Sequence, residues 1–336
     1  MPADIRSYRE LILQDGSRDK HLQAEEWDFC KKNFEHWCRT WYWLVNKKTE
    51  RCLFELNPIQ RWYLSESTNN DLILKARKVG ISTLKLAQGL HRFCFQSDQR
   101  GILVSHNNPT CVELFGYVKL AYDLLPDFLK PPLIVRQGQL LSGGEFPVGS
   151  PRAGEICGSK FQIMSAEGPR PGAGFTFTFV HLSEYAWFKH PTELKASVLQ
   201  ARGIDAPGAM ESTANGYNEF YEEYIYAKEN TTSRFKAHFF PWTDDPTCVA
   251  PVRNKKQWSY HVLEVKESAA LSDEQAQFYQ DCLEELSNDT AILKQEWPLN
   301  DIEAFKSTGR CYFDADLLQR LMDVANRTPM KHTEEA

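Results

Sequence analysis

The sequence contains no long apolar run and no pattern typical of an export signal. Its longest apolar runs, such as Phe175–Val180, are far shorter than the roughly 20 residues that a membrane-spanning helix needs. The N-terminal segment MPADIRSYRELILQDG has no basic stretch followed by an apolar one, which a secretory signal requires. These absences predict a cytoplasmic protein that is neither secreted nor inserted in a membrane.

Paired cysteines are also missing. The nine cysteines stand at irregular spacing, and no two form a CxxC pair. An odd number of scattered cysteines indicates reduced, mostly buried thiols. Four residues could in principle surround a zinc ion: Cys30, His36, Cys38 and Cys52. They lack the closely spaced ligand pairs of structural zinc sites, so we favour buried thiols.

An excess of positive charge is the third absence. The chain has 39 Lys and Arg against 45 Asp and Glu, a net charge of −6. Proteins that bind the phosphate backbone widely are usually basic, so any contact with nucleic acid must come from a local patch. The contents of hydrophobic residues, 42%, and charged residues, 25%, are those of an ordinary globular protein.

The order of strand-like and helix-like segments predicts an α/β fold. Between residues 57 and 245, short β-rich runs alternate with helical segments, which is typical of a parallel sheet with crossover helices. The predicted strands are Leu72–Ala76, Ile102–Ser105, Phe175–Leu182, Ala209–Ser212 and Phe235–Phe240. The predicted helices are Thr83–Phe95, Thr110–Leu125, Thr192–Gln200 and Asn218–Lys228. Leu133–Leu141 and Glu155–Ser165 are predicted to form an inserted hairpin rather than another crossover unit.

Two further regions flank this core. Residues 1–56 are predicted to form a helical and hairpin arm, in which TWYWLV and RCLFEL flank the turn Asn46–Glu50. We interpret the aromatic residues of this arm as cover for the core rather than as base-stacking groups. These residues are Trp41, Tyr42, Trp43 and Phe54. Residues 246–336 are mainly polar and helical, with a capping-box helix start at Ser272–Gln275, and predict a helical lid.

The segment Lys75–Thr83, KARKVGIST, predicts a phosphate-binding loop. A strand leads into a short turn with one glycine, and a helix then starts on serine and threonine. The backbone N–H groups of such a turn point at an anion, and a hydroxyl of Ser82 or Thr83 can bind Mg²⁺. Ile81 occupies the usual lysine position of GxxxxGK[ST], and the cations crowd the front of the loop instead. The alternative is a strand–turn–helix with a solvated basic cluster.

KARKVGIST resembles the variant Walker A motif of tailed-phage terminase large subunits, in which the lysine stands at the start of the loop. The resemblance implies that Lys75 is the phosphate lysine and Arg77 the loop arginine. The loop residues expected to contact the nucleotide are Lys75, Arg77, Lys78, Val79, Gly80, Ile81, Ser82 and Thr83. Ser82 or Thr83 would be the Mg²⁺ ligand.

A second motif follows the apolar run Phe175–Leu182, which ends in Ser183 and Glu184. In ATPases of this class, one acidic residue at a strand end holds Mg²⁺ through water and the next orients and deprotonates the attacking water. The resemblance implies the second role for Glu184. Ser183 replaces the first acid and is a weaker partner for the metal, although we expect both residues at the metal site. The alternative is an exposed glutamate at a strand edge.

Three further motifs occur in the order of that family. Gln60 in LNPIQRW resembles the glutamine that recognises adenine, since an amide can both donate and accept. ESTANG, residues 211–216, resembles the coupling motif that senses the γ-phosphate. The sensing groups would be Ser212, Thr213 and Asn215. QEWPL, residues 295–299, resembles the segment where terminase ATPase domains end. Taken singly, each motif could equally be an ordinary turn or polar loop.

Arg170 lies in GPRPGAG, residues 168–174, just before the second motif. The resemblance implies an arginine that reaches a neighbouring subunit's nucleotide and stabilises transition-state charge, an effect on the order of 10³ to 10⁵ in rate. Arg152 and Arg136 are alternative candidates. The plain alternative for Arg170 is an arginine on a solvated loop.

Together these motifs predict a P-loop NTPase of the ASCE, RecA-like type. We expect an N-terminal arm at residues 1–56, an ATPase core at 57–245 and a helical lid with the start of a linker at 246–336. ATP and Mg²⁺ are the expected cofactors. The resemblance implies hydrolysis-driven translocation of double-stranded DNA into a procapsid in the host cytoplasm. It implies as partners a portal protein, a small terminase subunit and further copies in a ring, expected to be a pentamer, with a monomer in isolation.

Terminase large subunits continue into a nuclease that needs converging acidic residues for a two-metal site. Residues 317–336 are too few for such a fold, so we expect no nuclease activity from this chain. Two other functions compete. A superfamily-2-like helicase would need a second RecA-like domain, for which residues 246–336 are too short and too helical. A nucleotide-binding scaffold without hydrolysis is motivated by Ser183 and Ile81.

Overall fold

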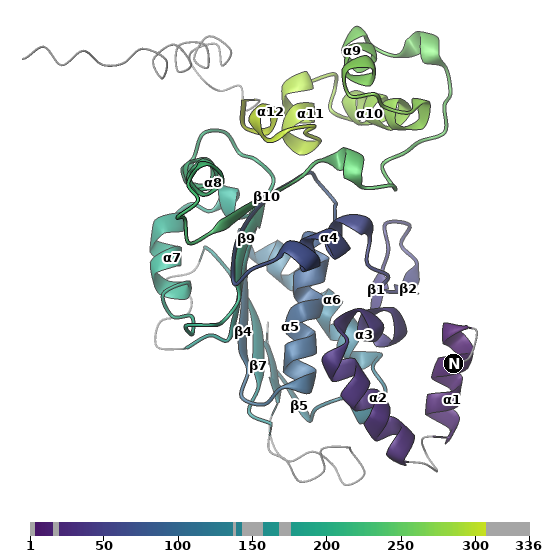
Figure 1. Ribbon diagram of the computed structural model, residues 1–336, viewed down its shortest axis with the longest axis vertical. Helices are drawn as coiled ribbons and strands as arrows, with labels where there is room; N and C mark the ends of the chain where they lie inside the picture. Colours follow the sequence, from purple (N-terminus) through teal and green to yellow (C-terminus); the bar gives the residue numbers. More distant parts are fainter. Residues whose placement is uncertain (1–3, 16–19, 137–138, 143–156, 168–175, 307–336) are drawn as a thin grey trace, which may run out of the picture. The chain divides into compact units, whose positions relative to one another are not determined.

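The computed structural model describes residues 4–15, 20–136, 139–142, 157–167 and 176–306 (Figure 1). The chain divides into two compact units. The first comprises Met1–Ile73, Gly80–Ser212 and Tyr226–His238, and the second Leu74–Val79, Thr213–Ile225 and Phe239–Ala336. Within the described ranges, no helix is both long and apolar enough to cross a membrane. The predicted boundaries after residues 56 and 245 stay predictions.

An eight-stranded sheet is the centre of the fold. Its strand order is β10-β3-β9-β8-β4-β7-β6-β5. The strands are β3 (Asn70–Lys75), β4 (Arg100–Ser105), β5 (Leu133–Arg136), β6 (Gln139–Ser142), β7 (Lys160–Ser165), β8 (Phe179–Ser183), β9 (Gly208–Ser212) and β10 (Lys236–Phe240). β4 runs parallel to β7 and to β8, and β8 runs parallel to β9. Every residue of β8 and β9 is buried, as expected for parallel strands covered on both faces.

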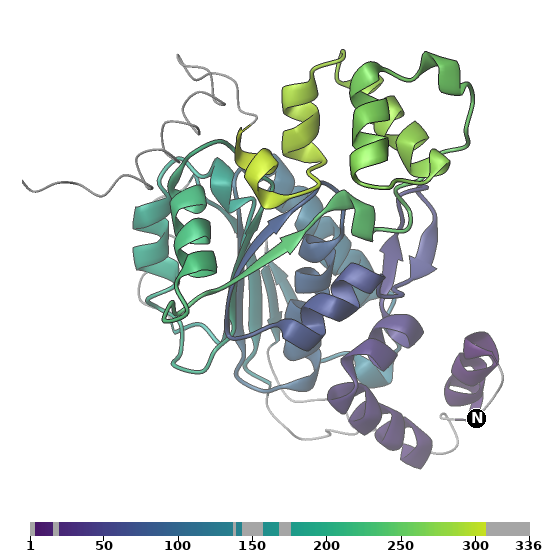
Figure 2. The same ribbon diagram turned by 45° about the horizontal axis from the view of Figure 1, so that its top comes forward.

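Helices cover the two faces of this sheet. α5 (Ile81–Phe95) and α6 (Asn108–Asp123) lie on one face, and α7 (Pro191–Val198) lies on the other (Figures 1 and 2). α5 follows β3 and α6 follows β4, which is the crossover pattern that the alternation of segments predicted. The predicted α/β class with a mainly parallel sheet is confirmed.

The prediction for residues 133–165 is partly wrong. β5 and β6 form an antiparallel hairpin, and β6 also pairs antiparallel with β7. However, β7 runs parallel to β4 in the central sheet and is reached through α6, so it completes another crossover unit. The sequence pattern predicted β7 and its antiparallel pairing within the hairpin region. It did not predict the parallel pairing of β7 with β4, which depends on tertiary packing.

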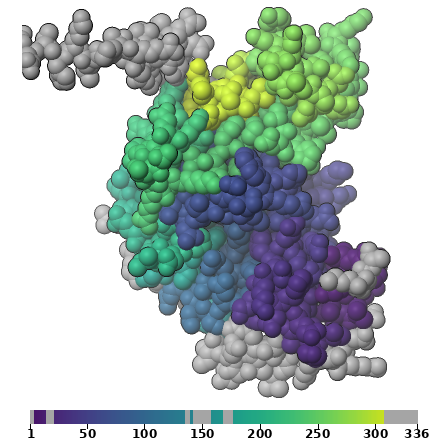
Figure 3. Space-filling model, in the orientation of Figure 1, coloured from purple at the N-terminus to yellow at the C-terminus, as the bar shows by residue number. Residues whose placement is uncertain are grey.

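The first described residues form three helices and a hairpin. Its helices are α1 (Ile5–Asp15), α2 (Lys20–Lys32) and α3 (Phe34–Trp41), followed by the antiparallel hairpin of β1 (Trp43–Val45) and β2 (Arg51–Leu53). Trp41, Tyr42 and Phe54 are buried, as expected for residues that cover the core, whereas Trp43 is partly exposed. Glu35 of α3 pairs with Arg61 of α4 (Pro58–Glu66) at 2.7 Å. In the space-filling view the purple arm adjoins the blue residues around α4 without a gap (Figure 3).

The described part of the second unit is mainly helical. Its helices include α9 (Tyr260–Ser268), α10 (Asp273–Glu285), α11 (Thr290–Glu296) and α12 (Asp301–Lys306), and α8 (Glu219–Glu229) begins in this unit. The capping box at Ser272 and Gln275 is present. Trp242 stacks on Tyr279 with ring centroids 5.3 Å apart. These contacts give the helices a core of their own.

The described cysteines are free thiols, and all but the partly exposed Cys52 are buried, as predicted. Cys311 lies outside the described residues.

Candidate functional site

The loop between β3 and α5 contains two residues in the left-handed region of backbone conformation. Lys78 has φ of 61° and Gly80 has φ of 85°. Gly80 is the N-cap of α5, and a Cβ at this position would lie 2.6 Å from Gln60 Nε2. The left-handed backbone therefore favours glycine here, and a Cβ would also force the Gln60 side chain to shift. The turn leads directly into the first N–H groups of a 15-residue helix, which is the arrangement that binds anions.

Gln60 holds this glycine in place. Its Nε2 donates to the Gly80 carbonyl at 2.7 Å, and its Oε1 accepts from the backbone N–H of Asn57 at 2.9 Å. The Asn57 side chain accepts in return from the Gln60 backbone N–H, which completes a capping box at the start of α4. Gln60 thus links the N-terminus of α4 to the loop. Its predicted contact with adenine stays a prediction.

Three cationic residues, Lys75, Arg77 and Lys78, stand at the start of the loop. Lys75 is the last residue of β3 and is buried. Arg77 donates from its backbone N–H to the Glu296 carbonyl at 2.8 Å, and its guanidinium lies 3.3 Å from the Glu296 carboxylate, so the predicted loop arginine has a carboxylate partner within the second unit. Lys78 is exposed. The side chains of Val79 and Ile81 are fully buried, so these residues offer a ligand only their backbone groups.

A buried carboxylate lies at the start of α5. Ser82, in the first turn of the helix, donates from its hydroxyl to Glu211 Oε1 at 2.5 Å. Ser183, at the end of β8, donates to the same oxygen at 2.8 Å. The Glu211 side chain is fully buried, and Thr83 beside Ser82 is half-buried. Two hydroxyls and one carboxylate therefore converge at the start of α5, the helix that follows the loop and is called the loop helix below.

The register of the sheet explains this convergence. Ser183 and Glu211 are paired neighbours in the parallel strands β8 and β9. Paired residues of adjacent strands point to the same face, so the glutamate side chain extends beside the serine. Glu211 was given no role from the sequence. The signal that could have found it is an acidic residue next to last in a predicted buried strand, one residue before the predicted sensor Ser212.

Glu184 follows β8 in a left-handed conformation, with φ of 59° and ψ of 46°. Residues other than glycine adopt this conformation infrequently and at an energetic cost, and such residues are concentrated at functional sites. The Ser212 hydroxyl lies 3.4 Å from Glu184 Oε2 and accepts from the Ala186 N–H at 3.2 Å. The structure therefore brings Ser183, Glu184 and Ser212 together at the ends of two neighbouring strands.

α5 itself carries a buried lysine. Lys85 is 5% exposed and follows Ser82 by three residues, so both lie on one side of α5. Its Nζ lies over the Tyr63 ring, 4.6 Å from the centroid. Burial lowers the pKa of Lys85 to about 8, and the attraction of Asp71 and Glu211 opposes this shift. The ammonium therefore offsets part of the cost of the buried Glu211 charge.

These oxygen donors fit magnesium. Mg²⁺ is a hard cation that prefers carboxylate, hydroxyl and water oxygens and usually keeps several waters. Ser82, Ser183 and Glu211 supply such oxygens, and His181 Nε2 lies 3.5 Å from Glu211 Oε1. The cluster would hold the metal of a magnesium–nucleotide complex at the first turn of α5.

The other predicted site residues belong to the second unit or are not fully described. Thr213, which is buried, and Asn215, which is partly exposed, belong to the second unit. Arg170 and Arg152 lie outside the described residues. Arg136 is the last residue of β5, where only its backbone is described. The predicted trans-acting arginine therefore stays a prediction.

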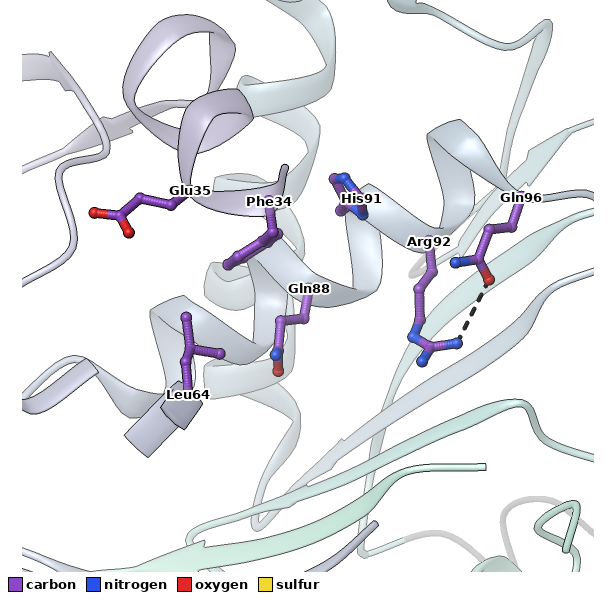
Figure 4. A pocket seen from close by; sticks show the side chains of 7 residues that line it. All are labelled: Phe34, Glu35, Leu64, Gln88, His91, Arg92 and Gln96. Carbon is purple, nitrogen blue, oxygen red and sulfur yellow. Dashed lines mark hydrogen bonds between the residues drawn. The ribbon is translucent and has the colours of Figure 1, made fainter. Parts of the chain in front are cut away.

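A pocket of about 280 Å³ lies between α3, α4 and α5 (Figure 4). It is lined by Phe34, Glu35, Leu64, Gln88, His91, Arg92 and Gln96. Arg92 and Gln96 are joined by a hydrogen bond of 3.5 Å (Figure 4). None of the lining residues is among those predicted to bind nucleotide, so we do not assign this pocket to the site.

The suggested zinc set is not what the N-terminal helices bring together. Cys30 and His36 lie within 4.8 Å of Glu26, a residue not considered for zinc, and Cys38 and Cys52 are not in this group. Glu26 accepts hydrogen bonds from Cys30 at 3.2 Å, from Trp41 at 2.6 Å and from Tyr8 at 2.5 Å, and lies 2.8 Å from His36 Nε2. These donors already satisfy the carboxylate, which explains the cluster without a metal.

Comparison with known proteins supports the fold. No protein-family model matches the sequence. The structure is similar to the large terminase ATPase domain of Thermus phage P74-26, with a TM-score of 0.51 and 16% identity over 73% of this chain and 93% of that chain. A mutant of the same domain gives a TM-score of 0.52 and 17% identity over the same shares. The large terminase of bacteriophage HK97 gives 0.54 and 14%, over 81% of this chain and 55% of that chain.

These likenesses show that the chain has the α/β fold found in phage large terminases and in their ATPase domain. The resemblance predicted from the motifs is confirmed at the level of fold. Identities of 14–17% show the fold alone, so activity and partners are argued from the site.

Proposed function

We propose that this protein hydrolyses ATP as a molecular motor. One observation carries the proposal. The hydroxyl of Ser82, in the first turn of α5, donates a hydrogen bond to the buried carboxylate of Glu211, which also accepts one from Ser183. A glycine turn, a helix N-terminus and converging oxygen groups form the set that phosphate and magnesium need. The fold is also that of a domain named as an ATPase, the large terminase ATPase domain of Thermus phage P74-26.

The residues have separate roles in this proposal. Backbone groups of the loop, with Lys75, Arg77 and Lys78, bind the phosphates, and Ser82 or Thr83 binds Mg²⁺. When bound, Mg²⁺ neutralises charge on the phosphate oxygens. Glu184 accepts the proton of the attacking water and orients it, since it stands at the strand end in a constrained conformation. Ser212, Thr213 and Asn215 sense the γ-phosphate, and Gln60 recognises adenine.

We further propose that hydrolysis translocates double-stranded DNA into a procapsid in the host cytoplasm. This step rests on the likeness to large terminases and on the motif order, with a portal protein, a small terminase subunit and a homo-oligomeric ring as partners. The proposed organisation is an arm at 1–56, a core at 57–245 and a lid at 246–336. With a net charge of −6, DNA contact would come from a local patch.

The first test is phosphate release from Mg–ATP by wild type, Lys75→Ala and Glu184→Gln. We expect turnover by wild type and its loss in both variants, with nucleotide binding kept in Glu184→Gln and weakened in Lys75→Ala. Lys119→Ala is the matched control, because this lysine pairs with Asp123 on the exposed side of α6 at 2.5 Å. Wild type that binds ATP without releasing phosphate would instead support the nucleotide-binding scaffold.

Stimulation by nucleic acid separates the motor classes. A packaging motor should be stimulated by duplex DNA more than by single-stranded DNA. The reverse preference would favour a superfamily-2-like helicase and contradict the packaging proposal.

The proposed trans-acting arginine has its own test. We expect slow hydrolysis from the isolated domain, with acceleration on assembly that Arg170→Ala abolishes. Unchanged activity of Arg170→Ala in the assembled form would remove this residue from the mechanism.

A further inference from the structure

We propose that Glu211 of β9 replaces the acidic residue that is missing at the end of β8 and is the carboxylate that fixes the magnesium-binding hydroxyl of Ser82. This inference rests on the proposed function, because it assigns the metal partner within the same nucleotide site. It assigns Glu211 a role as a positioning residue, and it explains how a site with serine at position 183 can bind the metal of a magnesium–nucleotide complex.

The geometry supports the replacement of an acid expected on β8 by a carboxylate on the neighbouring strand β9. Ser183 and Glu211 are register partners in parallel strands, whose Cα atoms lie about 4.8 Å apart. The glutamate reaches back toward position 183, where its Oε1 accepts from the Ser183 hydroxyl at 2.8 Å. The same oxygen accepts from Ser82 at 2.5 Å. A carboxylate from β9 thus occupies the space beside the residue that replaces the expected acid.

The hydrogen bond sets the direction of the Ser82 hydroxyl. A serine hydroxyl has one hydrogen to donate and two lone pairs to accept with. Because the hydrogen is directed at Glu211, the lone pairs of Ser82 Oγ are directed away from the carboxylate and are available to a cation. Glu211 also contributes the negative charge that Ser183 lacks.

The cost of burying Glu211 argues for a function. A fully buried carboxylate is expensive even when it is paired, and a neutral side chain of similar size would remove that cost. Here Lys85 attracts the charge electrostatically, and His181 Nε2 lies 3.5 Å from Glu211 Oε1. Lys85 and His181, both buried, therefore adjoin the one carboxylate that accepts the Ser82 hydrogen bond. A purely structural carboxylate remains the competing explanation, and the experiment must separate the two.

The experiment measures binding of a non-hydrolysable ATP analogue by calorimetry, with Mg²⁺ and with EDTA. The variants are Glu211→Gln, Glu211→Asp and Glu211→Gln combined with Ser183→Asp. Loss of a group that orients a metal ligand costs about 10–100-fold in metal affinity. We expect Glu211→Gln to weaken the Mg²⁺-dependent gain in affinity by about tenfold or more, with binding in EDTA unchanged.

Restoring the acid on β8 is the decisive step. Ser183→Asp added to Glu211→Gln should recover most of the Mg²⁺-dependent affinity, because the two positions are register partners. A purely structural carboxylate predicts no such recovery. Glu211→Asp keeps the buried charge but shortens the side chain by one methylene, so it should fold and still bind magnesium–nucleotide more weakly. This variant carries the test if Glu211→Gln fails to fold.

The outcomes distinguish this inference from the proposed function. Glu66→Gln is the control, because this exposed glutamate pairs with Lys236 at 2.9 Å. If wild type binds Mg–nucleotide and Lys75→Ala abolishes binding, but the Glu211 variants bind like wild type, the role of Glu211 is refuted and the nucleotide site stands. If Ser183→Asp fails to restore binding, the proposal that Glu211 replaces the acid missing at position 183 is also refuted. If wild type binds no nucleotide, both proposals are refuted.

Discussion

Two buried carboxylates in the first unit differ in what surrounds them. Glu26, in the N-terminal helices, is held by Tyr8, Trp41, His36 and Cys30. Glu211, at the end of β9, is held by the small hydroxyls of Ser82 and Ser183. The indole N–H of Trp41 can only donate, and with the other three partners it completes a buried network around Glu26. A serine hydroxyl keeps lone pairs for a ligand. We interpret the first carboxylate as part of the fold and propose the second as part of the nucleotide site.

The largest expected effect concerns turnover. Glu184→Gln should lower the rate of phosphate release by about 10²–10⁴-fold, the range expected for loss of a general base. Glu26→Gln, at the carboxylate assigned to the fold, should leave the rate per folded molecule unchanged. Steady-state phosphate release at saturating Mg–ATP measures both. Equal losses of rate in the two variants would contradict the assignment of Glu184 to the site and of Glu26 to the fold.

The second effect concerns stability. Glu26→Gln should lower the free energy of unfolding by about 2–4 kcal/mol, because it removes hydrogen bonds to a charged, buried group and leaves donors unpaired. Urea unfolding measures the loss. Arg6 and Glu10 form an exposed ion pair on α1, so Glu10→Gln is a control that should change stability by less than about 1 kcal/mol.

The same carboxylate should give a pH signature. Burial acts to raise the pKa of Glu26, but hydrogen bonds from His36, Trp41 and Tyr8 outweigh it and hold the pKa below its ordinary value. A depressed pKa contributes stability above the pKa of the unfolded chain, about 4.3, and this contribution is lost as the pH falls through the folded pKa. The stability difference between wild type and Glu26→Gln should therefore narrow below about pH 5. A constant difference down to pH 3 would show that the charge of Glu26 contributes nothing.

The smallest effect concerns the loop glycine. Gly80→Ala places a Cβ on a left-handed residue and 2.6 Å from Gln60 Nε2, so stability should fall by about 1–2 kcal/mol. Gly116 lies inside α6 with open space around its Cβ position, and Gly116→Ala should raise stability by about 0.5–1 kcal/mol. Thermal unfolding of both variants gives the comparison. Opposite signs are expected, and a neutral Gly80→Ala would show that the turn tolerates a side chain.

Much of the fold could be predicted because its signals are local. The strands around Leu72, Ile102 and Ala209 and the helix after Gly80 follow from apolar runs and from a glycine turn. β7 was misassigned because its second neighbour, β4, is far away in the sequence. The cluster of Glu26, Cys30 and His36 could not be predicted for a similar reason, since Glu26 joins the other two only after the N-terminal helices pack.

The sequence by itself determined the alternation of strands and helices, the glycine turn and the serines and glutamate that end the strands. These features depend on the periodicity of side chains and on backbone preferences, which act over a few residues. Only the tertiary structure decided that Glu211 lies against Ser82 and Ser183. That contact depends on which strands are neighbours and in which register, and a shift of one residue would turn the carboxylate to the opposite face of the sheet.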